Sequence, residues 1–546
     1  MIRNPVLPGF NADPSFLQVG ADYYLATSTF AWHPGVAIHH SRDLSHWRLL
    51  THALTRPSQL DLRGDGSSCG VWAPCLRFDH QAGLFTLLYT DVKNIASRFF
   101  DLHNRLITAP AIEGPWSDPV ALNASGFDPS LLIDDDGRAY VANLEWDFRK
   151  GYTHPGDIVL QEYSRKKRSL VGQPRRIYRG GSSLGCLEGP NLYHVGGWYY
   201  LIAAEGGTGY GHSVTVARSR SPWGPYEPDP SNPILTSLAQ PFEGRGDDDF
   251  LKPHLFNPEI AIQKPGHASI VQTEAGEWYM AHLGARPLLP SRRCVLGRET
   301  FLQRCSWTAD GWLRVEDPER RPRELVAEPL GVQPHVFPPR PLRDEFDSPE
   351  LPAWYASLRV PFSDSWASLS ERPGWLRLTG RESLHSLHEQ SVIARRIEHF
   401  AWEAETLLDF APERFQQMAG LVVMQGIETW YYLRLYRSES LGSLSVGIML
   451  SDRMALDELR EHRVAVSPGP CRLRAEVRGA HLQFFCAAKD GDLLPVGPPL
   501  DQTRISDEYD RSFAGAFVGL CCQDMSGRRK PAYFDYFRYA ELGSGA

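Results

Sequence analysis

A short turn followed by an apolar strand, a glycine turn and an aromatic strand recurs five times in the first part of this chain. The first four copies start at intervals of about 60 residues, at Asp13-Pro14-Ser15, Trp72-Ala73-Pro74, Asp128-Pro129-Ser130 and Glu188-Gly189-Pro190, and the fifth starts at His267-Ala268-Ser269. Gly and Asp-Gly turns between aromatic and β-branched runs predict a hairpin in each copy. Repeated small antiparallel sheets are typical of a β-propeller. The sequence therefore predicts a five-bladed β-propeller over residues 1–320.

The chain continues beyond these repeats, and its 546 residues exceed what one hydrophobic core usually supports. Residues 321–342 are rich in proline and charge, which predicts a linker that lies along the surface. Past this linker the repeat disappears, and apolar or alternating runs such as 430–435 and 471–477 are separated by turn residues. The sequence thus predicts an all-β chain with a second domain, a two-sheet β-sandwich, over residues 343–546.

Charge and cysteine content limit the binding partners and the cellular compartment that we expect for this protein. The net charge is −8, the isoelectric point is near 6.2 and no basic stripe is visible, so we expect no nucleic-acid partner and no membrane partner. Residues 1–5 lack an apolar signal core, and no stretch is long enough to cross a bilayer. Nine unpatterned cysteines suit a reducing compartment. We expect a cytoplasmic protein.

The repeat also predicts where carboxylates gather. In a propeller the innermost strand of each blade starts at one mouth of the central channel, so we expect Asp13, Asp128 and Glu188 to occupy equivalent places around it. Glycoside cleavage uses one carboxylic acid and one carboxylate, and a third carboxylate nearby raises the pKa of the acid. Asp-Pro is also a common turn dipeptide. Its recurrence at symmetry-related positions favours the catalytic interpretation, although spacing alone does not order the roles.

Other residues near the starts of the repeats are candidates for ligand binding. Phe30, Trp32 and Trp72 supply the flat rings on which sugar faces stack, and Trp72 opens a blade. His267, at the equivalent place in blade five, is a candidate metal ligand or substrate contact, with a purely structural role as the alternative. Asp134, Asp135 and Asp136 are predicted to form a hairpin turn, because the spacing of a calcium-binding EF-hand is missing.

Several motifs together resemble the two-domain β-xylosidase branch of glycoside hydrolase family 43. The segments concerned are 4–15, Thr27-Ser28-Thr29-Phe30, Pro34-Gly35-Val36, His39-His40-Ser41 with Asp43-Leu44 and Trp47, Leu296-Gly297-Arg298-Glu299-Thr300, and Phe513-Ala514-Gly515-Ala516-Phe517. The resemblance spans the whole chain. It implies that the sandwich is a concanavalin-like jelly roll.

The resemblance also implies roles for single residues. Asp13 would be the general base that activates water, Glu188 the general acid, and Asp128 the residue that orients the acid and tunes its pKa. Arg298 would hydrogen-bond the sugar, beside Trp72, Ala73 and Phe30. Some members hold a calcium ion on the propeller axis near the histidine that matches His267, so the resemblance allows a structural Ca²⁺ here without requiring a cofactor.

These features lead us to expect an inverting exo-enzyme that releases D-xylose from the non-reducing ends of β-1,4-xylooligosaccharides, with α-L-arabinofuranosidase side activity. We expect a homo-oligomer, with Phe513 of the sandwich lining the leaving-group side of the pocket. The alternatives are an enzyme that is mainly an α-L-arabinofuranosidase, a retaining fructosidase-type propeller and a non-catalytic sugar-binding propeller. The sequence around Asp13 lacks the Asn-Asp-Pro-Asn run of the retaining propellers. A lectin has no need of three converging acids.

Overall fold

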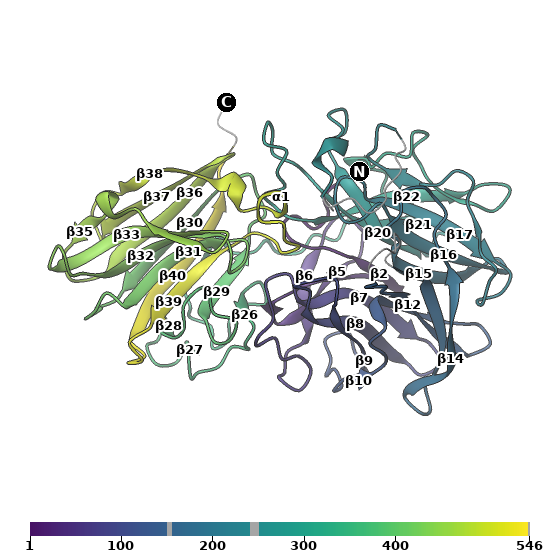
Figure 1. The fold of residues 1–546 in the computed structure, drawn as a ribbon, viewed down its shortest axis with the longest axis horizontal. Helices are drawn as coiled ribbons and strands as arrows, with labels where there is room; N and C mark the ends of the chain where they lie inside the picture. Colours follow the sequence, from purple (N-terminus) through teal and green to yellow (C-terminus); the bar gives the residue numbers. More distant parts are fainter. Residues whose placement is uncertain (150–155, 241–250, 544–546) are drawn as a thin grey trace.

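The computed structural model describes residues 1–149, 156–240 and 251–543. It consists of two all-β domains lying side by side, with the short helix α1 (Asp507–Asp510) between them (Figure 1). In the part of the chain that the structure describes, no helix is long and apolar enough to cross a membrane.

The first domain contains five antiparallel sheets, each built around four strands that follow one another in the chain. From the innermost strand outward, blade one contains β2 (Ser15–Val19), β3 (Asp22–Thr27), β5 (Gly35–Ser41) and β6 (Arg48–Leu54), and blade two contains β7 (Gly70–Asp79), β8 (Leu84–Asn94), β9 (Asp101–Ala109) and β10 (Val120–Ala121). Blade three contains β11 (Gly126–Ile133), β12 (Ala139–Glu145), β13 (Ile158–Ser164) and β14 (Ser169–Tyr178), and blade four contains β15 (Glu188–Val195), β16 (Trp198–Glu205), β17 (Ser213–Ser219) and β18 (Glu227–Pro228), with β19 (Leu235–Thr236) also on β17. Blade five contains β20 (Gln263–Gln272), β21 (Trp278–Ala285), β22 (Glu299–Trp307) and β23 (Leu313–Val315). The innermost strands of consecutive blades pack against one another, and β20 closes the ring against β2. The predicted five-bladed propeller is confirmed.

Small side chains near the start of the innermost strands join neighbouring blades. The hydroxyl of Ser15 accepts a hydrogen bond from the Leu76 N–H at 2.8 Å, and that of Ser269 accepts one from the Phe16 N–H at 2.9 Å. Ser269 Oγ also donates to the Pro14 carbonyl at 2.7 Å. Ser15 and Ser269 therefore satisfy backbone groups between blades, which explains why a short polar residue suits these two positions.

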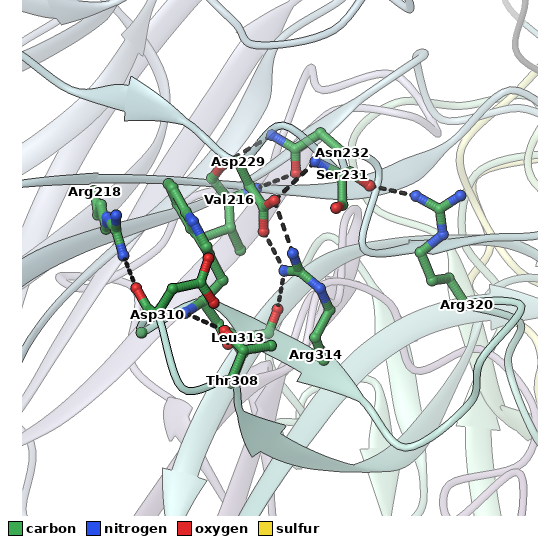
Figure 2. A network of polar contacts seen from close by, with 12 residues as sticks. Val216, Arg218, Asp229, Ser231, Asn232, Thr308, Asp310, Leu313, Arg314 and Arg320 are labelled. Carbon is green, nitrogen blue, oxygen red and sulfur yellow. Dashed lines mark hydrogen bonds and ion pairs between the residues drawn. The ribbon is translucent and has the colours of Figure 1, made fainter.

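Blades four and five are also joined at their outer strands by a polar network (Figure 2). Arg314 on β23 pairs with Asp229 just after β18, with Nη2 and Oδ1 at 2.9 Å. Arg320 donates to the carbonyls of Ser231 and Pro233 in the same turn. In a separate two-stranded sheet β1 (Ile2–Arg3) pairs with β24 (Leu325–Val326), so the two ends of the propeller sequence are joined to each other.

The second domain is a sandwich of two antiparallel sheets. One sheet contains β27 (Ala367–Ser368), β28 (Leu376–Thr379), β40 (Pro531–Glu541), β30 (Ala401–Asp409), β36 (Cys471–Arg478), β37 (His481–Ala488) and β38 (Leu494–Asp501), with β25 (Arg343–Asp344) on β40. The other contains β34 (Ala455–Glu458), β33 (Ser443–Asp452), β32 (Trp430–Ser438), β31 (Gln417–Met424), β39 (Phe517–Asp524), β29 (Ser391–Arg396) and β26 (Ala356–Leu358), with β35 (Val464–Val466) on β33. Single-turn 3₁₀ segments lie at Pro253–Leu255, Arg460–His462 and Gln502–Arg504. A large apolar core fills the space between the two sheets. The predicted sandwich is confirmed.

The two domains share structure at their boundary. Strand β4 (Trp32–His33), from the propeller sequence, pairs with β26 and extends the second sheet of the sandwich. On the other side of the boundary a buried ion pair joins Lys264 of β20 to Glu508 of α1, and the other carboxylate oxygen of Glu508 accepts from the Cys294 N–H at 2.8 Å. Residues of the sandwich are therefore held close to one mouth of the propeller.

Candidate active site

All five innermost strands have the same backbone irregularity at this mouth. Asp13, Ala73, Asp128, Gly189 and His267 have positive φ angles of 55°, 44°, 57°, 59° and 46°. In blades two to five the pairing register with the next strand shifts at these residues, as in a β-bulge. Non-glycine residues adopt such angles rarely and at a cost, and bulges of this kind re-aim side chains. The repeated bulge turns the side chains of Asp13, Asp128 and His267 toward one point.

Glu188 does not occupy the place equivalent to Asp13 and Asp128, contrary to the expectation from the repeat. It lies one residue earlier, in register with Trp72 and Phe127, and Gly189 takes the place of the bulge residue. A Cβ on Gly189 would lie 3.0 Å from Nδ1 of His267. The glycine therefore makes room for the histidine ring, and the acid of blade four reaches the site from the preceding position.

Asp13 is buried and bound through both carboxylate oxygens. Ser28 Oγ donates to Oδ2 at 2.6 Å and Arg298 Nη1 donates to Oδ1 at 3.2 Å. Burial alone would raise the pKa of Asp13, but Arg298, His267 and the Ser28 hydrogen bond outweigh it and hold the pKa below its usual value. Asp13 is thus an ionised carboxylate at neutral pH, as a general base must be.

Asp128 has the opposite electrostatic environment. Its Oδ2 accepts a hydrogen bond from the Gly189 N–H at 2.9 Å and lies 3.9 Å from Nδ1 of His267. Burial, together with the negative charges of Glu188 and Asp13, raises the pKa of Asp128 to about 7. The carboxylate cluster therefore retains a proton near neutral pH.

Glu188 faces a histidine that the sequence analysis did not single out. Oε1 of Glu188 lies 3.3 Å from Nε2 of His212, and within the described residues neither atom has a hydrogen-bond partner. The His212 ring is fully buried and lies against Gly266, where a Cβ would come within 2.2 Å of it. The glycine before His267 is therefore required for His212 to reach the acid.

Arg298 connects the carboxylates to the aromatic residues and to the sandwich. Its Nη2 donates to the Phe513 carbonyl at 3.0 Å, and its guanidinium lies 5.4 Å from the ring centre of Phe30 and 5.9 Å from that of Phe513. Phe513 in turn meets Trp72 edge to face, with ring centres 6.0 Å apart. Trp72 is partly exposed, whereas Phe30 and Ala73 are buried. Ser28, not predicted as a site residue, accepts a hydrogen bond from the Ala73 N–H at 2.8 Å while donating to Asp13.

Trp32 does not belong to this group, which corrects the sequence-based expectation. It lies in β4 and stacks on Phe517 of the sandwich, with ring centres 3.9 Å apart. Its ring therefore holds the two domains together instead of facing the carboxylates. The other predicted site residues, Asp13, Asp128, Glu188, His267, Arg298, Trp72, Ala73, Phe30 and Phe513, are linked by the contacts given above.

The residues around His267 do not fit a calcium ion. Calcium takes about six to eight oxygen ligands. The Asp13 and Asp128 oxygens that face Nδ1 of His267 already accept hydrogen bonds from Arg298 and Gly189. Arg77 of β7 donates to Asn191 Oδ1 of β15 at 3.0 Å, which adds a positive charge among the innermost strands.

A grouping with metal-ligand spacing does occur in the described part of the chain, at Asp134, Asp135 and His194. It lies at the far end of blades three and four, away from the mouth. Tyr199 and His194 already hydrogen-bond Asp134 there, at 2.7 and 2.9 Å. The carbonyl of Asp134 accepts from the Gly137 N–H at 2.9 Å, so this segment forms a turn, as the sequence predicts.

Two family models match the chain, one for each domain. Residues 2–313 match glycosyl hydrolases family 43, and residues 343–540 match the β-xylosidase C-terminal concanavalin A-like domain. The chain is 44% identical to xylosidase/arabinosidase 43B of Humicola insolens, over 98% of this chain and 97% of that one. It is 42% identical to a β-xylosidase of Bacillus subtilis, over 99% of both chains. The crystal structure of xylan β-1,4-xylosidase from Bacillus halodurans superposes with a TM-score of 0.93 at 48% identity, covering 99% of this chain and 100% of that one. A match of this extent to both domains shows that the chain belongs to glycosyl hydrolases family 43.

Proposed function

We propose that this protein is an inverting exo-β-D-xylosidase that removes single xylose units from the non-reducing ends of β-1,4-xylooligosaccharides. The observation that carries the proposal is the meeting, at the mouth of the propeller, of an ionised Asp13, an Asp128 whose raised pKa retains a proton, and Glu188. The full-length similarity to proteins named as xylosidases supports xylose as the sugar.

In the proposed reaction Asp13 removes a proton from a water molecule, whose oxygen bonds to the anomeric carbon from the side opposite the leaving group. The bond between that carbon and the glycosidic oxygen breaks. The oxygen keeps the electron pair of this bond and receives a proton from Glu188. Arg298 and Ser28 hold Asp13 in its ionised form, and His212 fixes the carboxyl group of Glu188. Asp128 holds the backbone that follows Glu188 through the Gly189 N–H.

Exo action fits the way the sandwich lies against the site. The Phe513 N–H donates to Ser68 Oγ at 3.0 Å, and its carbonyl accepts from Arg298, so this segment of the sandwich is fixed at the mouth. An enzyme that cuts inside a chain needs a site that is open at both ends. A site closed on one side by the sandwich would admit only a chain end.

The stereochemistry of the product tests the proposed role of Asp13. We expect the first sugar released from a β-xyloside to be α-xylose, seen by proton NMR before it mutarotates, because a single displacement by water inverts the anomeric carbon. If β-xylose appears first, the reaction is a double displacement and Asp13 is a nucleophile.

A second candidate activity is the hydrolysis of α-L-arabinofuranosides, since the relative from Humicola insolens is named a xylosidase/arabinosidase. We expect 4-nitrophenyl β-D-xyloside to be hydrolysed faster than 4-nitrophenyl α-L-arabinofuranoside when both are measured side by side. The opposite ranking would make the protein mainly an arabinofuranosidase. Equal loss of both rates in Asp13→Asn would place both reactions at one site.

Phe513→Ala tests whether the sandwich contributes to substrate binding. We expect KM for xylobiose to rise more than KM for a short aryl xyloside, because the ring lies beside Trp72 on the leaving-group side, and we expect Tm to change little. Phe517→Ala is the matched control: that ring is buried against Trp32, and its loss should cost ~3–5 kcal/mol of stability. A large fall in Tm with an unchanged KM for Phe513→Ala would assign its ring to the core.

A further inference from the structure

A row of aromatic rings leads from the site across the mouth of the propeller. Trp72 meets Phe127 edge to face at 5.7 Å, Phe127 meets Trp146 at 5.7 Å, and Trp146 stacks on Phe100 at 4.5 Å with an interplanar angle of 6°. Next to this row in the sequence stand Phe99 and Phe148, whose rings meet edge to face at 4.7 Å. The row therefore runs from a predicted substrate contact to Phe100, and the Phe99–Phe148 pair lies on the same two loops as its outer rings.

The two terminal phenylalanines are exposed to solvent. Phe99 is 65% exposed and Phe148 is 49% exposed. Single exposed apolar side chains are common on protein surfaces, whereas exposed apolar side chains that gather in one place are a feature of ligand-binding and protein-binding sites. Packing between blades explains why the rings nearer the site are buried, but it does not explain the exposed positions of Phe99 and Phe148.

Their loops are held in place by bonds between blades. Phe99 belongs to the loop that links β8 to β9 in blade two, and Phe148 follows β12 in blade three. Trp146 Nε1 donates to the Arg98 carbonyl at 2.8 Å, and Arg98 Nη2 donates to the Asp147 carbonyl at 2.9 Å. The Trp146 N–H also donates to the Ser125 carbonyl at 2.8 Å, which ties the loop to the start of β11 near Asp128. The two rings are thus presented on a fixed support.

The sandwich reaches only the inner end of the row, where Phe513 meets Trp72. Its other contacts described above go to β4, Ser68, Lys264, Cys294 and Arg298, which belong to blade one, the loop that follows it and blade five. Both β8 and β12 run back to the mouth that carries the carboxylates, because they pair antiparallel with β7 and β11. A leaving saccharide that exits opposite the sandwich would pass over blades two and three.

We propose that Phe99 and Phe148, supported by Phe100 and Trp146, form a distal binding surface for the second and later sugars of the leaving group. This inference rests on the proposed xylosidase function and extends it to a preference for longer oligosaccharides. Sugar rings stack on flat aromatic faces, and rigid rings lose little conformational entropy on binding. The row starts at Trp72, and its outer ring Trp146 is hydrogen-bonded to the loop of Phe99, so the occupant that we infer is the same chain whose terminal sugar is cleaved.

The test compares chain lengths in the full-length enzyme. In the F99A/F148A variant we expect kcat/KM to fall roughly three- to tenfold for xylotetraose and xylopentaose, and to stay unchanged for 4-nitrophenyl β-xyloside and xylobiose. F99L/F148L, which keeps the apolar volume but removes the flat rings, should show the same length-dependent loss. F415A removes another phenylalanine, 52% exposed in the sandwich, and should change none of these values.

Two results would overturn the proposal. One is an equal change, or no change, at every chain length. The other is a length-independent change accompanied by a lower mass in sedimentation, which would make the patch a contact between copies of the chain. The rate of 4-nitrophenyl β-xyloside hydrolysis by the unaltered enzyme separates these results from a failure of the proposed function, since loss of the distal surface leaves that rate intact.

Discussion

Asp13→Asn is expected to lower kcat for xylobiose by roughly 10²–10⁴ while the protein remains folded. The amide has almost the same shape as the carboxylate but cannot take a proton from water. It also removes the negative charge that Arg298 binds at 3.2 Å, and a buried cation without its partner is destabilising. We therefore expect a lower Tm together with the loss of rate. Steady-state kinetics and thermal unfolding of the same preparation would separate the two effects.

Asp79→Asn provides the matched control for this variant. Asp79 is also a buried aspartate paired with an arginine, Arg165, but it stands at the end of β7 farthest from the mouth. Its replacement should lower Tm without lowering kcat. If Asp13→Asn reduced kcat only to the extent that Asp79→Asn does, Asp13 would be a structural residue and another group would have to activate the water.

The positions of Asp13, Asp128 and His267 could be predicted because the fold repeats. Once the period identifies a propeller, residues at the same point of each repeat must lie around one axis, and the structure places these three side chains together. The aromatic second strand of each hairpin could be predicted in the same way, because each blade must bury this strand against its neighbours. In a fold with this symmetry, residues one repeat apart in the sequence lie around the same axis, whatever the conformation of the loops between them.

Features that break the repeat were not predictable in the same way. Glu188 is displaced by one residue because the His267 ring fills the space that a Cβ at position 189 would need. His212 meets Glu188 through the space left by Gly266, a contact between segments far apart in the sequence. The offset glycines Gly189 and Gly266 are visible in the sequence, but only the structure shows which rings they admit. Trp32 was assigned to the wrong surface, since nothing in its own segment reveals pairing with β26.

Glu188→Gln is expected to slow the hydrolysis of xylobiose by roughly 10²–10⁴ and to slow an activated aryl xyloside far less. A sugar alkoxide is a poor leaving group and needs a proton as the bond breaks, whereas a dinitrophenolate leaves without one. The amide side chain of the variant cannot supply the proton, so the loss should grow with the pKa of the leaving group. A series of aryl xylosides measured in the variant and the unaltered enzyme would show this as a steeper dependence of log kcat on leaving-group pKa.

Glu205→Gln controls for the removal of a buried glutamate from the same blade. Glu205 ends β16, beside the strand that begins with Glu188, and its carboxylate accepts hydrogen bonds from Gly181 and Ser182 in the loop before that strand. Its replacement should affect stability and leave the leaving-group dependence as it is. Equal rate losses for xylobiose and the activated xyloside in Glu188→Gln would contradict the acid role. The proton would then come from Asp128, whose raised pKa lets it hold a proton at this mouth.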